Sequence, residues 1–197
     1  MSNHISYSQV ISHRGETWFV NSKGSGLFTH FLRQILDQIN AMFSFHNKLF
    51  LLRFDLHQLE ATPTSKHVSE FLKGVLNKIK GKYDLNRTVY AWAREIESAE
   101  QQHYHCFIVV DGNKVQKPHL ITALMRQDWN LYYDGSLHWP SKRCYYQLSR
   151  YDRELTQEAI YHVSYLAKGR GKGRKPPQSK NYGGSRLKPK QSNCEER

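Results

Sequence analysis

The 197-residue sequence predicts an α+β domain built on an antiparallel sheet. Apolar residues recur at helical spacing in long segments, and these segments alternate with apolar strands. Two of the strands, 88–97 and 104–110, are separated by a short polar stretch, as expected for a hairpin. Hairpins mixed with long helices are typical of the α+β class, and the length suits one domain or one domain with a tail.

The individual elements follow from their apolar periodicity. A helix with one buried face repeats apolar residues every three or four positions, whereas a buried strand is a short apolar run bounded by turn residues. On this basis the predicted helices are 25–44, 68–79, 118–129 and 154–168. The predicted strands are 17–20, 48–57, 88–97, 104–110 and 143–149.

Composition points to a polyanionic partner. The chain carries a formal net charge of +12 and has a pI of about 9.6, which favours nucleic acid over an anionic membrane as the ligand. Its three widely spaced cysteines include no C-x-x-C pair, which argues against a disulfide framework or a zinc knuckle. With no apolar run long enough to span a membrane, we expect a cytoplasmic protein.

The most informative stretch is the predicted hairpin itself. Its first strand ends with Glu95 and Glu97, and its second begins with His103 and His105. Residues two apart in a strand point to the same face, so each pair presents two ligands on one side of the sheet. If the strands pair, a carboxylate and two imidazoles meet around one divalent cation. The ligand types suit Mn²⁺, Mg²⁺ with waters, or Zn²⁺.

A second constellation lies on the last predicted helix. Tyr161, Tyr165 and Lys168 are spaced i, i+4 and i+7, so a continuous helix would place them on one stripe. Either the tyrosines simply pack against the sheet, or one of them is a phenolic nucleophile. A phenol has a pKa near 10 and needs a nearby cation to become a phenolate, which a metal or Lys168 would supply.

Together these motifs resemble the HUH endonuclease superfamily of rolling-circle replication initiators, relaxases and single-stranded-DNA transposases. Trp92-Ala-Arg94-Glu95 is followed after seven residues by His103-Tyr104-His105, and later by Tyr165-Leu-Ala-Lys168. Within the superfamily the pattern is most similar to the filamentous-phage (inovirus) gene II-type replication proteins and their prophage relatives. Tyr104 is bulkier than the usual aliphatic residue, and Tyr161 leaves open whether there is a second nucleophile.

The resemblance implies a fold and a mechanism. Residues 1–168 would form an HUH-type nuclease domain, with a helical extension over about 1–45 and a five-stranded antiparallel sheet of RRM-like topology. Glu95, His103 and His105 would bind Mg²⁺ or Mn²⁺, with Glu97 as the fallback ligand. Tyr165, assisted by Lys168 and in one variant joined by Tyr161, would cut single-stranded origin DNA and form a 5′-phosphotyrosine, initiating rolling-circle replication in a bacterial host.

The end of the chain is expected to be a basic tail. Residues 169–197 contain nine Lys or Arg and two Glu, so they carry most of the net charge. Such a Gly/Pro/Lys-rich segment usually adds non-specific affinity for nucleic acid, although Tyr182–Arg186 resembles a family element that docks near the site. The expected DNA contacts are Arg53, Arg170, Lys172, Arg174, Lys175 and Arg186.

Other functions fit the same pattern. A transposase or a plasmid relaxase would use the same chemistry, and a non-catalytic nucleic-acid-binding regulator would need only an RRM-like sheet. The sequence contains no helicase motif or ATP-binding loop, so a replication initiator would depend on a host helicase and polymerase. The regulator alternative predicts that Tyr165 and the two histidines are dispensable.

Overall fold

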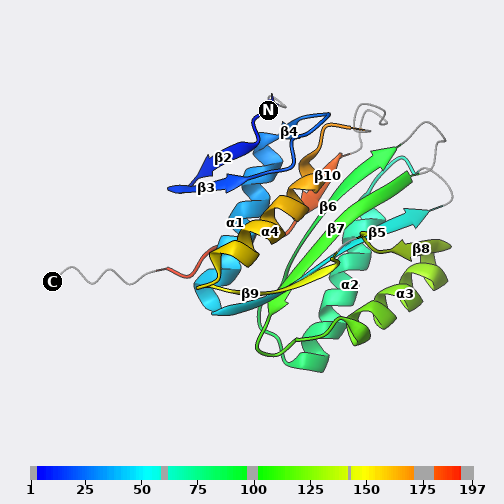
Figure 1. The fold of residues 1–197 in the computed structure, drawn as a ribbon. Coiled ribbons are helices and arrows are strands. Elements are labelled where there is room, and N and C mark those ends of the chain that lie inside the picture. The colour runs from blue at the N-terminus through cyan, green and yellow to red at the C-terminus, as the bar shows by residue number, and fades with distance from the viewer. Residues whose placement is uncertain (1–3, 59–61, 97–101, 142, 171–179, 192–197) are drawn as a thin grey trace.

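The computed structural model describes residues 4–58, 62–96, 102–141, 143–170 and 180–191. Within these ranges four α-helices pack on a large antiparallel sheet, which confirms the α+β class (Figure 1). The helices are α1 (Thr29–Phe45), α2 (Lys66–Tyr83), α3 (His119–Tyr133) and α4 (Arg153–Val163), and α4 leads into a 3₁₀ helix, η1 (Ser164–Ala167).

Six of the described strands form the main sheet. They are β5 (Lys48–Gln58), β6 (Val89–Ile96), β7 (Gln102–Asp111), β8 (Gly135–His138), β9 (Tyr145–Ser149) and β10 (Tyr182–Gly184). The order is β10-β6-β7-β5-β8, and β9 pairs with the other half of β5. Long antiparallel ladders join β5 to β7 and β7 to β6, so these three strands form the rigid centre of the sheet.

The expectation of a five-stranded sheet was wrong. The predicted strand 17–20 corresponds to β3 (Glu16–Phe19), which pairs with β2 (Val10–His13) in a separate hairpin. The main sheet instead contains two strands that the prediction lacked, β8 and β10. Both are short, and both begin or end with glycine, so neither has the apolar alternation that reveals a strand.

Two helix boundaries also differ from the prediction. The first helix begins at Thr29 and not at Ser25, because Leu27–Phe28 form β4, which pairs with β1 (Ile5–Ser6). Short strands therefore precede α1 in the segment that was expected to be a helical extension. The last α-helix ends at Val163, where the chain tightens into η1.

Side-chain alternation along the central strands builds two hydrophobic cores. On β5, Leu49 and Leu51 face α1 and α4, whereas Phe50 and Leu52 face α2 and α3. Figure 1 shows these two helix pairs on opposite sides of the sheet. Burying one such side chain stabilises the fold by about 1.5–3 kcal/mol, so both layers contribute substantially.

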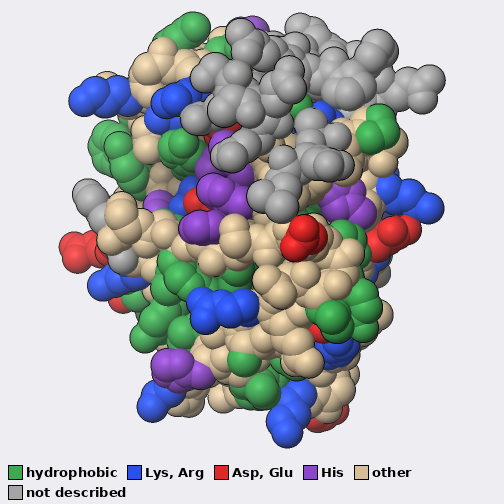
Figure 2. Space-filling view, turned by 90° about the vertical axis from the view of Figure 1, so that its right-hand side faces the viewer, with side chains coloured by type: hydrophobic (Ala, Val, Ile, Leu, Met, Phe, Trp, Pro, Cys, Tyr) green, Lys and Arg blue, Asp and Glu red, His purple; other side chains and the backbone are tan. Residues whose placement is uncertain are grey.

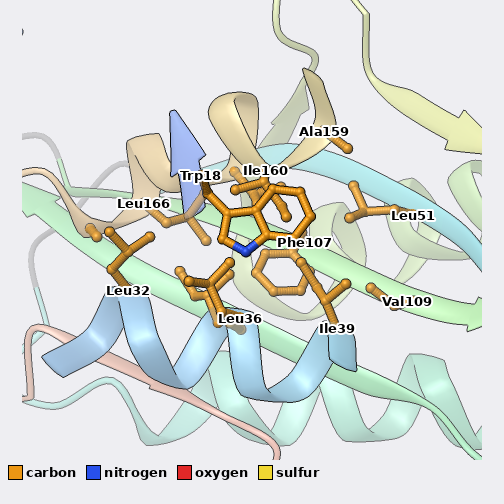
Figure 3. Packing of buried hydrophobic residues seen from close by; sticks show 14 of the residues in the cluster. Trp18, Leu32, Leu36, Ile39, Leu51, Phe107, Val109, Ala159, Ile160 and Leu166 are labelled. Carbon is orange, nitrogen blue, oxygen red and sulfur yellow. The ribbon is translucent and has the colours of Figure 1, made fainter. Parts of the chain in front are cut away.

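The core beneath α1 and α4 has an additional layer from the N-terminal hairpin. Figure 3 shows Trp18 of β3 packed among Leu36 of α1, Phe107 of β7 and Ile160 of α4. The opposite core has its own large anchor, Trp129 of α3, which is fully buried. The hairpin therefore covers only one of the two faces.

The end of the chain returns to the sheet. Tyr182, Gly183 and Gly184 pair with Ala93, Trp92 and Ala91 on β6. A Cβ added at Gly183 would lie 2.7 Å from the Trp92 ring, so glycine permits the close approach. Thus 182–184, expected to belong to a basic tail, form the edge strand beside β6.

Candidate active site

The register of the central strands brings the predicted ligands together. Glu95 on β6 lies opposite His103 on β7, and His105 is two residues further along the same face. One ligand atom from each of these residues lies within 4.8 Å of the others. The convergence of Glu95, His103 and His105 follows the sequence prediction, whereas Glu97 lies outside the described residues.

The next strand supplies a further carboxylate. Asp55 on β5 lies opposite His105, and its Oδ1 is 2.7 Å from His105 Nδ1. On the other side of the ring, His105 Nε2 is 2.7 Å from Glu95 Oε2. Burial lowers the pKa of His105, but the hydrogen bonds with Asp55 and Glu95 outweigh it and the pKa is raised overall.

This donor set fits a divalent cation. Two imidazoles and a carboxylate are common ligands of Mn²⁺ and Zn²⁺, and Mg²⁺ accepts a similar set when water completes its shell. The hydrogen bond to Asp55 at Nδ1 leaves Nε2 of His105 facing Glu95, which is the arrangement by which an outer carboxylate orients a ligating histidine. The nitrogen that would hold the ion is therefore already aimed at the other ligands.

Tyr165 lies against this cluster. Its ring meets the His105 ring edge-on, with centroids 4.8 Å apart. Two cations flank the phenol, with Arg53 Cζ 5.2 Å and Lys168 Nζ 5.1 Å from the ring centroid. Burial and the nearby Glu95 raise the pKa of Tyr165, although Arg53 and Arg170 oppose them, so the phenol is protonated at neutral pH.

Local contacts hold η1 and its tyrosine in place. Ser164 donates to the carbonyl of Tyr161 and accepts the backbone N–H of Asn21. Lys168 forms a β-bridge with Leu27, and its Nζ donates to the carbonyl of Lys23 at 3.0 Å. The N-terminal segment therefore fixes the position of the candidate nucleophile, a role that the sequence did not reveal.

Tyr161 is separated from Tyr165 by the change of helix type. The expected stripe of Tyr161, Tyr165 and Lys168 requires 3.6 residues per turn, but the chain becomes a 3₁₀ helix at Ser164. Tyr161 is 45% exposed on α4, and within the described part of the chain it makes no ring contact with the histidines. The two tyrosines therefore occupy different environments.

The predicted DNA-contacting residues separate into three groups. Arg53 is buried, 3.5 Å from Asp55, and belongs to the cluster itself. Arg170 is exposed and its Nε lies 3.7 Å from Glu95 Oε1, whereas Arg186 is exposed after β10. The remaining three, Lys172, Arg174 and Lys175, lie outside the described residues.

Two additional histidines adjoin the site. His57 on β5 stacks on His103 at 5.0 Å between centroids, and His138 on β8 lies 4.2 Å from His57. Burial and the neighbouring histidines lower the pKa of His57 to about 4, so its ring is neutral at physiological pH. Histidines gather on the surface seen in Figure 2. His138 was missed because β8 carries no clear strand pattern.

The fold and the site together define an α+β domain with a histidine–carboxylate centre beside a tyrosine. The chain belongs to the YagK/YfjJ C-terminal domain family, whose model matches residues 15–185. No curated protein and no solved structure matches it significantly. None of the helices in the described residues is long and apolar enough to cross a membrane.

Proposed function

We propose that this protein is a metal-dependent nickase and strand transferase for single-stranded DNA that acts through a 5′-phosphotyrosine. The observation that carries the proposal is the edge-on contact between Tyr165 and His105. Tyr165 is the candidate nucleophile, Glu95, His103 and His105 are the candidate metal ligands, and the protein is strongly basic. A phosphodiester is the substrate that matches all three features.

Tyr165, Arg53 and Lys168 each have a role in this reaction. Tyr165 Oη attacks the phosphorus and the bond to the 3′ oxygen breaks. The phenol loses its proton and the departing 3′ oxygen gains one, so one phosphodiester is exchanged for another. Arg53 and Lys168 lie beside the phenol and stabilise negative charge on it and on the phosphate.

A divalent cation held by Glu95, His103 and His105 would polarise the scissile phosphate and stabilise charge on its non-bridging oxygens. Asp55 orients His105 for that role through the 2.7 Å contact at Nδ1. Because the bond energy is retained in the phosphotyrosine, a later attack by a 3′ hydroxyl rejoins the strand without ATP.

The resemblance to inovirus and prophage initiators suggests that the cellular role is to start rolling-circle replication with a Mg²⁺ or Mn²⁺ cofactor and host helicase and polymerase. It also suggests that the domain has the HUH version of the α+β fold. The central order β6-β7-β5, with the histidines on the middle strand, supports that assignment. Transposition and plasmid mobilisation use the same chemistry and remain the alternatives.

The test uses a random-sequence single-stranded DNA library labelled at the 3′ end, incubated with Mn²⁺ and the full chain. On a denaturing gel we expect a labelled covalent adduct, because the 5′-phosphotyrosine retains the 3′ portion of the DNA. The same library labelled at its 5′ end should release shortened fragments without an adduct.

Two matched variants identify the nucleophile. Tyr165→Phe should abolish the adduct, whereas Tyr161→Phe should retain it because that ring lies apart from the cluster. If the wild-type protein binds the library but forms no adduct with either Mn²⁺ or Mg²⁺, the enzymatic proposal is wrong and a DNA-binding regulator is the better description.

A further inference from the structure

The face of the sheet opposite the candidate active site contains a buried cation. Arg94 precedes Glu95 on β6, so its side chain points to the side covered by α2 and α3. It lies opposite Tyr104 on β7, and only 2% of its surface is exposed. It is therefore a charged side chain buried in a mainly apolar layer.

Among the residues that the structure describes, the guanidinium of Arg94 has no hydrogen-bond partner. Its Nε, Nη1 and Nη2 are all buried, and none of them has a partner among the described residues. Burying an unpaired ion costs several kcal/mol, so native proteins rarely leave all donors of an arginine unsatisfied. A partner that is not part of the chain would remove this cost.

The neighbouring groups are those of an anion site. The Tyr104 hydroxyl donates to Ser65 Oγ at 3.2 Å, and Ser65 is the N-cap of the 18-residue helix α2. Within the described residues its side chain makes no capping bond, so Ser65 does not occupy the first backbone N–H groups of α2. A helix N-terminus also favours negative charge through its dipole.

Tyr104, the cross-strand neighbour of Arg94, contacts the first turn of α2, where the His67 ring centroid lies 5.8 Å from its own. Burial lowers the pKa of His67, in the first turn of α2, and the charge of Arg94 lowers it further. Burial raises the pKa of Tyr104, and Arg94 opposes that shift. These directions agree with the contacts by which Tyr104 links the strand of Arg94 to Ser65 and His67 of α2.

We propose that Arg94 and the N-terminus of α2 bind a phosphate group on the sheet face opposite the candidate active site. The planar guanidinium offers paired donors that match two oxygens of one oxyanion, and the helix end offers backbone donors to a third. The group can be free inorganic phosphate or the terminal phosphate of a polynucleotide. Glu95 and its ligand partners face the other way, so this site is independent of the proposed nuclease chemistry.

The experiment follows thermal unfolding of the full chain in EDTA, with inorganic phosphate titrated against chloride at equal ionic strength. We expect a saturable rise in Tm for the wild-type protein, because a ligand bound only to the native state stabilises it. Arg94→Met should show no such rise. Without phosphate it should be at least as stable as the wild type, since it removes an unpaired buried charge.

Arg126→Met is the matched control, because Arg126 lies on α3, on the same side of the sheet as Arg94, but is exposed. It should retain the phosphate response. If Arg94→Met does not fold, Arg94→Lys provides the test: it keeps the charge but loses the paired donors, so saturation should require more phosphate.

A second arm separates the two sources of the phosphate group. A short oligodeoxynucleotide with a 5′-phosphate is compared with the same oligonucleotide without it. An Arg94-dependent rise only with the phosphorylated form identifies a polynucleotide end, and a rise with inorganic phosphate alone identifies a free anion. If no probe gives an Arg94-dependent rise, the proposal is overturned.

Discussion

The two faces of the central sheet share their strands but differ in chemistry. Towards α1 and α4 the apolar core gives way at the strand ends to Glu95, His103 and His105. Towards α2 and α3 the apolar layer continues, interrupted by the guanidinium of Arg94. Neighbouring residues of one strand thus enter unrelated environments. A shift of one residue along β6 would exchange the two environments, so the register determines which side chains meet on each face.

The largest expected effects on stability come from substitutions in the two hydrophobic cores, one on each side of the sheet. Leu36→Ala on α1 and Leu72→Ala on α2 each empty a fully packed site, since both side chains are at most 1% exposed. Each should lower the free energy of unfolding by about 2–5 kcal/mol, measured by chemical denaturation. Similar losses would show that both layers support the sheet equally. A loss well below this range for either variant would mean that its layer packs loosely.

On the sheet face that carries the candidate active site, a substitution of Asp55 should weaken metal binding. Asp55→Asn keeps the shape of the side chain but removes the charge that orients His105. Mn²⁺ affinity, measured by calorimetric titration, should fall about 10- to 100-fold, as is typical for the outer partner of a ligating histidine.

Asp37→Asn on α1 is the matched control for Asp55→Asn, because it makes the same chemical change outside the cluster. It should leave Mn²⁺ affinity unchanged. Equal affinity of Asp55→Asn and the wild-type protein would exclude Asp55 from metal binding.

The smallest expected effect on stability concerns the contact between α1 and the β2–β3 hairpin, which covers only the α1/α4 side of the sheet. Asp37 accepts from Arg14 Nε at 2.6 Å and lies 2.8 Å from His13 Nε2. Burial raises the pKa of Asp37, but the bonds to His13 and Arg14 outweigh it, and the pKa is lowered from its usual 3.8. A partly exposed pair of this kind contributes at most about 1 kcal/mol.

Because the folded-state pKa of Asp37 is depressed, its contribution is complete above the unfolded-state pKa and is lost as the pH falls through the folded-state value. Wild type should therefore be more stable than Asp37→Asn at neutral pH. The difference should shrink as the pH falls below about 3.8 and disappear below the folded-state pKa. The measurement is denaturant unfolding at several pH values. A difference that persists in acid would contradict this interpretation.

The sequence predicted the centre of the molecule well, because its signals there are local. Apolar runs marked β5, β6 and β7, and the two-residue alternation placed His103 and His105 on one face. The convergence with Glu95 then required only that the two strands pair in the register that the structure has. The boundaries of α2 and α3 also agreed to within a few residues.

Features that depend on distant contacts could not be predicted. Beyond the end of α4 at Val163, Ser164 of η1 contacts Asn21, and Lys168 contacts Lys23 and Leu27, which are all far away in sequence. No periodicity records such contacts, so the sequence predicted a continuous α-helix where the structure has a 3₁₀ helix from Ser164. The burial of Arg94 could not be predicted for a related reason, since burial of a charged residue is a property of the packed structure.

Strand β10 has a consequence for how the protein behaves in solution. It occupies the edge of β6 through Ala91, Trp92 and Ala93, whose backbone groups would otherwise be open to another chain. An apolar strand with an uncovered edge is a template for aggregation. Residues 180–191 therefore protect the edge of β6, the strand that carries both Arg94 and Glu95. A chain shortened before Lys180 would be prone to self-association.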